Sequence, residues 1–216
     1  MAYLKRQSVP KTWPVTRKGT AYLVRPKSSI NNGVPLLVIL REVLGVVQNR
    51  NEAKKILLTK QILLNGKEAR DERETAQLFD VITIIPSNKN YKTIISKNKK
   101  FDFVEIPNNE AGCKVAKIVN KKTLKGKKTQ LNLSDGRNFL SDIKCNTGDS
   151  IIIDFAGKKI DKCLPMEKGR NVFVFSGKHA GQVGVLEEVD KEKKTAQVKA
   201  DKEIIHVLTK QVIVTK

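Results

Sequence analysis

The chain has 216 residues, with 42 Lys and Arg residues against 22 Asp and Glu residues, and a formal net charge of +20. So large an excess repels itself and indicates a polyanionic partner, which in a cell is nucleic acid or an anionic membrane surface. No apolar run is long enough to form a membrane-spanning helix, and the N-terminus lacks the apolar core of a secretory signal.

The charge lies mainly in two parts of the chain. Residues 1–35 carry seven basic side chains and no acid, for +7, and residues 87–165 carry +9. Residues 36–86 and 166–216 are closer to neutral, at +1 and +3. We therefore predict four parts: a basic extended arm (1–35), a small helix–helix–strand module (36–86), a central antiparallel β-barrel-like domain (87–165) and a small C-terminal β-barrel (166–216). The predicted fold class is α+β.

The N-terminal arm combines basic and aromatic residues. A basic segment without acids and with few apolar residues seldom folds alone, and commonly becomes ordered on a phosphate backbone. Tyr3, Trp13 and Tyr22 lie among the basic residues, and such rings stack on nucleic-acid bases or pack onto protein. We expect the arm to dock on RNA rather than to remain a solvated tail. Its candidate RNA contacts are Lys5, Arg6, Lys11, Trp13, Arg17, Lys18 and Arg25.

Residues 36–59 show the periodicity of two helices. Apolar residues recur at helical spacing from Leu36, and Gly45 marks the end of the first helix. Asn49 or Asn51 can cap a second helix. After it, Asn65-Gly66 is a strong signal for a two-residue hairpin turn, and a strand is expected over 81–85.

Basic residues cluster around the second helix and the hairpin that follows it. Arg50 and Lys54 are one turn apart, so a helix presents them on one face. Such a face either contacts phosphates or is an ordinary solvated surface. The candidate RNA contacts here are Arg41, Arg50, Lys54, Lys55, Lys60 and Lys67.

The remainder of the chain is predicted to consist of short antiparallel strands. Strands are expected over 91–95, 101–106, 114–119, 130–133, 151–155, 172–175, 182–189, 195–199, 204–208 and 212–214. A basic loop is expected over 120–128, a hairpin turn at Asp135-Gly136, and a glycine-bounded basic loop over 176–181. The candidate RNA contacts in these parts are Lys121, Lys122, Lys125, Lys127, Lys128, Arg137, Arg170, Lys178 and His179.

Motifs for catalysis and metal binding are missing from the sequence. It contains no phosphate-binding GxxxxGK[ST], no GxGxxG after a strand, no HExxH and no GxSxG. Cys113, Cys145 and Cys163 form no CxxC, and neither His179 nor His206 lies near them in sequence. We therefore expect reduced thiols, no metal, no cofactor and no enzymatic activity.

Taken together, these segments resemble small-subunit ribosomal protein four of the archaeal and eukaryotic type, the "four-e" ribosomal protein family. The resemblance covers essentially the whole chain, in order, and the chain's end soon after its last strands favours the archaeal type. It rests on co-linear motifs: Tyr3–Arg6, Pro10–Pro14, Arg25-Pro26, Pro35–Val38, Leu40-Arg41, Asn49–Glu52, Asn65–Lys67, Asp80–Ile84, Asn90-Tyr91, Asn120-Lys121, Asp135–Arg137, Gly148-Asp149 and Gly169–Asn171 with Gly177–Gly184.

The resemblance implies that 36–86 is an RNA-binding module shared with the bacterial four protein, pseudouridine synthases and tyrosyl-tRNA synthetases. It implies that 166–216 is a KOW barrel, which is SH3-like. The function it implies is that of a structural constituent of the small ribosomal subunit, cytoplasmic and ribosome-associated, which binds and stabilises small-subunit rRNA during translation. Its expected partners are that rRNA and neighbouring ribosomal proteins, with no membrane, no small-molecule substrate and no obligate homo-oligomer.

Other functions are left open at this point. A free-standing RNA-binding chaperone or elongation-type factor would use the KOW barrel alone. An RNA-modifying enzyme would use the helical module for targeting, but the chain lacks a further domain of catalytic size. A peripheral membrane protein would need an amphipathic face that the arm does not have.

Overall fold

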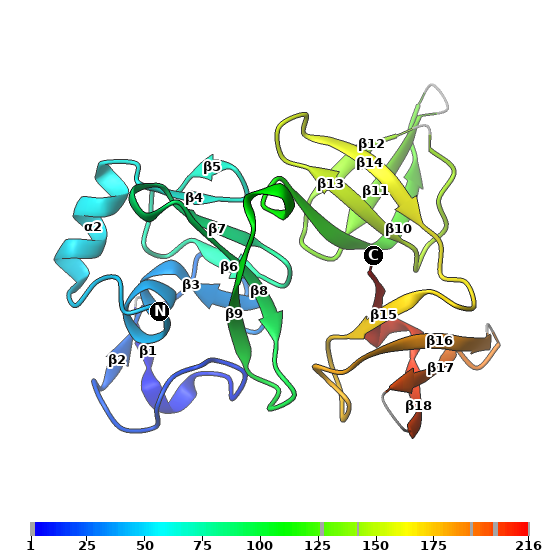
Figure 1. Ribbon diagram of the computed structural model, residues 1–216, viewed down its shortest axis with the longest axis horizontal. Coiled ribbons are helices and arrows are strands. Elements are labelled where there is room, and N and C mark those ends of the chain that lie inside the picture. The colour runs from blue at the N-terminus through cyan, green and yellow to red at the C-terminus, as the bar shows by residue number, and fades with distance from the viewer. Residues whose placement is uncertain (1–2, 126–127, 142, 191, 201–202, 216) are drawn as a thin grey trace. The chain divides into compact units, whose positions relative to one another are not determined.

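The computed structural model describes residues 3–125, 128–141, 143–190, 192–200 and 203–215 (Figure 1). Strands dominate and helices are few, which confirms the predicted α+β class. Among the described residues, no helix is both long and apolar enough to cross a membrane. The chain forms two compact units. Unit 1 comprises Met1–Ile95 with Lys100–Gly112, and unit 2 comprises Ser96–Lys99 with Cys113–Lys216.

The two predicted helices are present in unit 1. The first begins as α1 (Leu36–Val38) and continues as a π-type segment, η2 (Ile39–Val43), in which each N–H reaches back five residues. Gly45, at φ +62°, ends it in the left-handed conformation that glycine adopts without a steric penalty. The second is α2 (Arg50–Leu58), whose buried face contains Ala53 and Leu57.

The start of α2 is capped through its third residue. Glu52 accepts hydrogen bonds from the backbone N–H of Gln48 at 2.8 Å and of Asn49 at 3.4 Å. These bonds, with that from Gln48 the stronger, lower the pKa of Glu52. Asn49, one of the two caps that the sequence allows, is the N-cap residue, and it forms a capping box with Glu52.

The main sheet of unit 1 is antiparallel, in the order β5-β4-β7-β8-β9. The predicted turn joins β4 to β5, with Asn65 at φ +54° and Gly66 at φ +72°, which fits a type I′ turn. Because β8 pairs with β7 and β9 pairs with β8, this sheet continues past the predicted segment boundary at residue 86. The strands are β4 (Ile62–Leu64), β5 (Lys67–Glu68), β7 (Val81–Ile84), β8 (Lys89–Ile95) and β9 (Phe101–Ile106), with β3 (Gly33–Pro35) paired to β6 (Thr75–Gln77) beside them in unit 1.

The N-terminal arm is anchored to unit 1. Its strands β1 (Leu4–Lys5) and β2 (Tyr22–Leu23) pair with each other, and Leu4 and Leu23 are buried. Trp13 is only 1% exposed, and its ring N–H donates to the Ile30 carbonyl at 3.2 Å. Of the two environments expected for the Trp13 ring, the structure shows packing onto protein. Its predicted role as a base-stacking RNA contact is therefore corrected: the ring is not accessible.

Unit 2 contains two curled antiparallel sheets among its described residues, with the orders β12-β11-β10-β13-β14 and β18-β17-β16-β15-β19. The first sheet packs its core around Ile118, Leu131 and Ile151, and the second around Val172, Leu186 and Val198. The strands are β10 (Cys113–Thr123), β11 (Thr129–Leu133), β12 (Asn138–Leu140), β13 (Ser150–Asp154), β14 (Lys159–Leu164), β15 (Asn171–Val174), β16 (Val183–Asp190), β17 (Thr195–Ala200), β18 (Glu203–Leu208) and β19 (Val212–Val214).

The predicted basic loop over 120–128 is wrong in its extent. Strand β10 continues to Thr123 and pairs with β11, with Lys122 opposite Gln130. The connection is thus limited to 124–128. The reason is that ladder pairing satisfies the backbone of residues 120–123 while their polar side chains stay at the surface.

A buried lysine connects the two sheets of unit 2. Lys117, on β10, is 6% exposed, and its Nζ donates to the carbonyls of Val212 at 2.6 Å and of Thr209. Nearby, the backbone N–H of Val214 donates to Ser150 Oγ at 2.9 Å. Both the charged and the neutral amine of a lysine can donate to two carbonyls, so these bonds do not by themselves require the charge.

Replacing Trp13 by Ala should destabilise the fold. Loss of a fully buried Trp side chain costs about 3–5 kcal/mol in free energy of unfolding, because the cavity it leaves is only partly closed. Urea denaturation measures this change. The matched control is Tyr22→Ala, since Tyr22 is 57% exposed and should cost far less. Equal losses in the two variants would show that Trp13 is not a core residue.

Because of Lys117, the free energy of unfolding should change with pH in the alkaline range. Burial lowers its pKa to about 8, whereas an unfolded lysine has a pKa of about 10.4. Between these values the unfolded chain binds more protons at this site, so the free energy of unfolding rises with pH. The rise is on the order of 3 kcal/mol, and the Lys117→Met variant should lack it. Urea denaturation at a series of pH values tests this, and parallel pH profiles for the two proteins would contradict it.

Candidate nucleic-acid interface

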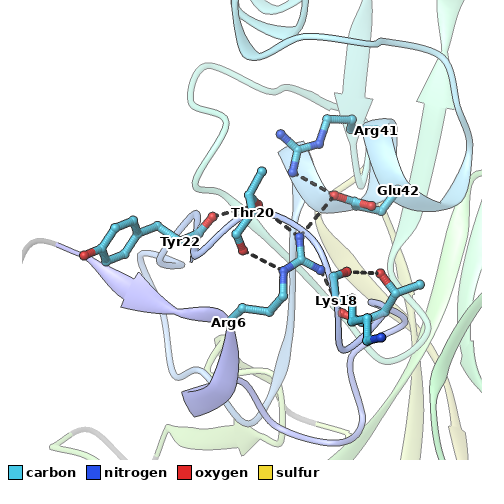
Figure 2. Close-up of polar contacts among 7 residues, drawn as sticks. Arg6, Lys18, Thr20, Tyr22, Arg41 and Glu42 are labelled. Carbon is cyan, nitrogen blue, oxygen red and sulfur yellow. Dashed lines mark hydrogen bonds and ion pairs between the residues drawn. The ribbon is translucent and has the colours of Figure 1, made fainter.

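Arg6 organises the loop of the arm that lies between β1 and β2. Figure 2 shows its guanidinium group surrounded by backbone and side-chain acceptors. Its Nε donates to the Thr20 carbonyl at 2.8 Å, its Nη1 to the Thr16 carbonyl at 2.8 Å, and its Nη2 to Thr20 Oγ1 at 3.0 Å. Glu42 lies 4.0 Å away, and the Arg6 side chain is 8% exposed. The predicted role of Arg6 as an RNA contact is therefore corrected to that of a loop organiser.

Other basic residues of unit 1 face solvent. Lys54 and Lys55 lie on the exposed side of α2, opposite the buried Ala53 and Leu57. Lys60, just after α2, pairs with Glu68 at 3.0 Å and remains two-thirds exposed. The predicted contacts that are exposed in unit 1 are Lys5, Lys11, Arg17, Lys18, Arg50, Lys54, Lys55, Lys60 and Lys67.

Arg50 is both exposed and held in place. Its Nε donates to Glu72 Oε1 at 2.7 Å, and Nη2 donates to the same oxygen. Glu72 is buried, and its hydrogen bond with Arg50 raises the pKa of the arginine. The Arg50 side chain nevertheless remains 57% exposed. A guanidinium carries five N–H donors, so Glu72 can fix its orientation and leave donors for an anion.

A hollow of about 300 Å³ lies next to Arg50 in unit 1. The basic residues in its lining come from the arm, from the first helix, from the start of α2 and from the turn before β6. They are Arg25, Arg41, Arg50 and Arg73, and the lining also contains Tyr3 and Tyr22. Arg41 is held by Glu42 at 2.7 Å. The hollow brings three predicted contacts together with residues that were not on the predicted list.

In unit 2, the basic residues at the end of β10 and in its connection to β11 divide into exposed residues and residues engaged in contacts. Lys122, Lys125 and Lys128 are exposed, whereas Lys121 Nζ donates to the Cys145 carbonyl. Lys127 lies outside the described residues. Arg137 is 3.5 Å from Asp135, a carboxylate that also binds the buried Lys114 at 2.7 Å.

The glycine-bounded loop over 176–181 has a structural constraint at its end. Gly181 has φ +89°, and a Cβ there would lie 2.3 Å from the Ser96 carbonyl oxygen, so only glycine fits. Lys178 is exposed and His179 is half-buried in the same loop, while Arg170 is exposed before β15. Gly181 thus serves backbone packing, and Lys178 and Arg170 remain at the surface.

The thiols and carboxylates form no metal centre in the part of the chain that the structure describes. Cys145 and Cys163 are hydrogen-bonded neighbours, and burial raises the pKa of Cys163 to about 12. A thiol with so high a pKa stays protonated and is a poor nucleophile.

Comparison with known proteins identifies the family. The family model described as "Ribosomal family S4e" matches residues 87–160, and the model described as "KOW motif" matches residues 168–199. A small ribosomal subunit protein eS4 from Methanocella arvoryzae is 40% identical over 190 residues, which is 87% of this chain and 80% of that protein. The chain belongs to ribosomal family S4e. This confirms the resemblance seen in the sequence.

Further relatives of this S4e chain agree. The eS4 protein of Nanoarchaeum equitans is 34% identical and covers 88% of this chain and 82% of that protein. The crystal structure of the 30S ribosomal protein S4e from Thermoplasma acidophilum superposes with a TM-score of 0.74 at 23% identity, covering 85% of this chain and 95% of that chain, which shows a common fold. The predicted archaeal type and KOW motif are both confirmed.

Arg73, Tyr3 and Tyr22 line the hollow, but they are not among the RNA contacts predicted from the sequence. Arg73 lies in the acid-rich stretch Asp71–Glu74, so charge counting passes over it. The two tyrosines stood out as aromatic residues of the arm. Only the pairing of β1 with β2 brings them together, and that pairing is a long-range contact.

The assigned role of Arg6 is testable through stability. Arg6→Gln should lower the free energy of unfolding by about 1–3 kcal/mol, because several acceptors in the arm lose a charged donor. Lys5→Gln removes the same charge from an exposed neighbour and should have little effect. Thermal and urea denaturation compare the two. A stable Arg6→Gln protein would return Arg6 to the list of surface contacts.

Proposed function

We propose that this protein is a structural constituent of the small ribosomal subunit that binds and stabilises its rRNA. The observation that carries the proposal is the 40% identity, over 87% of the chain, to a protein named as a small ribosomal subunit protein. We place the protein on cytoplasmic ribosomes, with rRNA and neighbouring ribosomal proteins as partners and without a catalytic role. The four-part division of the chain belongs to the same proposal.

The charge distribution supports this function. Exposed lysines occur on the arm, on α2 and on the β10–β11 connection, and few of them have carboxylate partners. Such cations bind phosphates and release condensed counterions. Duplex RNA hides its base edges in a deep groove, so contacts of this kind recognise its shape, phosphates and 2′-hydroxyls. Lysines on several elements suit a protein surrounded by folded RNA.

The KOW motif favours one alternative, a free-standing RNA-binding chaperone or elongation-type factor. Sedimentation of a cell extract at low and at moderate salt separates the two. Co-migration with the small subunit that persists through a moderate-salt wash supports the ribosomal function. A protein found only in the free pool would support the alternative.

Lys54 and Lys55 offer the sharpest test of RNA contact. Each lysine–phosphate contact contributes about one unit to the slope of log affinity against log salt. The variant Lys54→Glu with Lys55→Glu should weaken rRNA binding and reduce that slope by about two. Arg50 is unsuitable for reversal, because Arg50→Glu would place a second carboxylate beside the buried Glu72.

The matched control reverses the charges of Lys193 and Lys194 by replacing both with Glu. These two lysines are exposed on the turn before β17 and lie outside the proposed site. Filter binding to small-subunit rRNA over a salt series measures both variants. An unchanged slope for Lys54→Glu with Lys55→Glu would show that the exposed side of α2 is only a solvated surface.

A further inference from the structure

The arginine-lined hollow of unit 1 has a composition that points to a particular ligand. Its lining contains four arginines and no acidic residue among the residues that form it. Its volume of about 300 Å³ is at the lower end of the range for small-molecule pockets. A site of this size is suited to one small anionic group and is too small for a duplex.

Two tyrosines give the hollow an aromatic side. Tyr3 and Tyr22 have ring centroids 5.4 Å apart at an interplanar angle of 81°, so they meet edge to face. They are 58% and 57% exposed. Tyr3 directly precedes β1, and Tyr22 lies on β2, the strand paired with it. An exposed aromatic pair is a stacking surface, and flat nucleobases are the natural ligands of such surfaces in RNA-binding proteins.

Three of the four arginine side chains of the hollow, Arg41, Arg50 and Arg73, are oriented by the protein. Glu42 holds Arg41, the buried Glu72 holds Arg50, and Arg73 Nε donates to the Arg25 carbonyl at 3.1 Å. Each guanidinium keeps further N–H donors in a fixed plane. Preoriented guanidinium groups bind phosphate oxygens in a bidentate manner at a reduced entropic cost.

Stacking surface and phosphate donors together define a nucleotide. We propose that this hollow holds one unstacked nucleotide of an RNA strand, with its base against Tyr22 or Tyr3 and its phosphate on Arg41, Arg50 and Arg73. The inference rests on the proposed function, since rRNA supplies the strand. It goes further, because phosphate contacts alone would make no use of the tyrosines. A free nucleotide has the same chemistry and is the alternative source.

The test compares binding of a single-stranded RNA oligonucleotide and of its duplex, by fluorescence anisotropy with the full-length protein. Tyr22→Leu should weaken single-strand binding about fivefold or more, the lower end for loss of one base–aromatic stack. Duplex binding should be unaffected. The matched control is Tyr91→Leu, on β8 and outside the hollow. Arg73→Gln should reduce the salt slope of single-strand binding by about one, whereas the exposed Arg70→Gln in the same unit should leave it unchanged.

A second measurement locates the base directly. Photo-crosslinking with an oligonucleotide that contains 4-thiouridine should yield a peptide carrying Tyr3 or Tyr22. Unchanged single-strand affinity in Tyr22→Leu, or crosslinks confined to other peptides, would overturn the inference. Displacement of the oligonucleotide by a nucleoside monophosphate at equal or lower concentration would overturn the RNA strand as the source.

The two proposals fail in different ways. If wild-type protein binds small-subunit rRNA while Tyr22→Leu and Arg73→Gln behave as wild type on single strands, only the nucleotide site is lost. If wild-type protein binds neither rRNA nor oligonucleotide, the proposed function is lost and the nucleotide site falls with it.

Discussion

The central constraint on this protein is that its 42 basic side chains have only 22 acidic side chains with which to form ion pairs. The carboxylates with the best-defined partners are used to fix positions in the fold. Glu72 and Asp135 are buried beside Arg50 and Lys114, and Glu52 caps α2. Removing charges from water is costly unless they are paired. Asp135 therefore stabilises the enclosed Lys114, and the half-exposed Arg50 stabilises the enclosed Glu72. Some surface lysines, such as Lys60 with Glu68, also have an acidic partner. Since 22 acids cannot pair with 42 cations, an excess of positive charge is left for a polyanion.

This distribution explains how residues 36–86, with a net charge of only +1, can present exposed cations to solvent. Their acidic side chains hold arginines in place: Glu42 contacts Arg6 and Arg41, and Glu72 contacts Arg50. Lys54 and Lys55 on α2 are exposed. Net charge is therefore a poor measure of binding here. What matters is which carboxylates are already engaged, and the sequence does not contain that information.

Local rules predicted much of the fold. The helices over 36–59, the Asn65-Gly66 turn and the β-branched strands follow from periodicity and turn chemistry, which act over a few residues. Strands β12 and β14 were not predicted. Their sequences, NFL and KIDKCL, alternate only weakly between apolar and polar residues, and pairing with neighbouring strands holds them in the sheet. The extent of β10 was missed for the same reason, since ladder pairing with β11 determines it.

The site residues show the same difference between what local sequence predicts and what long-range contacts determine. Exposed lysines were predictable from charge, whereas Arg6, Trp13 and Lys121 took structural roles through partners at least ten residues away. The arm shows why such contacts matter: an acid-free segment must obtain its carboxylates from elsewhere. Asp71 pairs with Lys27 of the arm at 3.0 Å, and Glu42 of the first helix lies 4.0 Å from Arg6. Together with the hydrogen bonds between the arm and Arg73, these ion pairs hold the arm against the rest of unit 1, where Tyr3 and Tyr22 line the hollow with Arg41 and Arg50. The arm's lack of acid is thus one reason why its cations depend on carboxylates that lie elsewhere in unit 1.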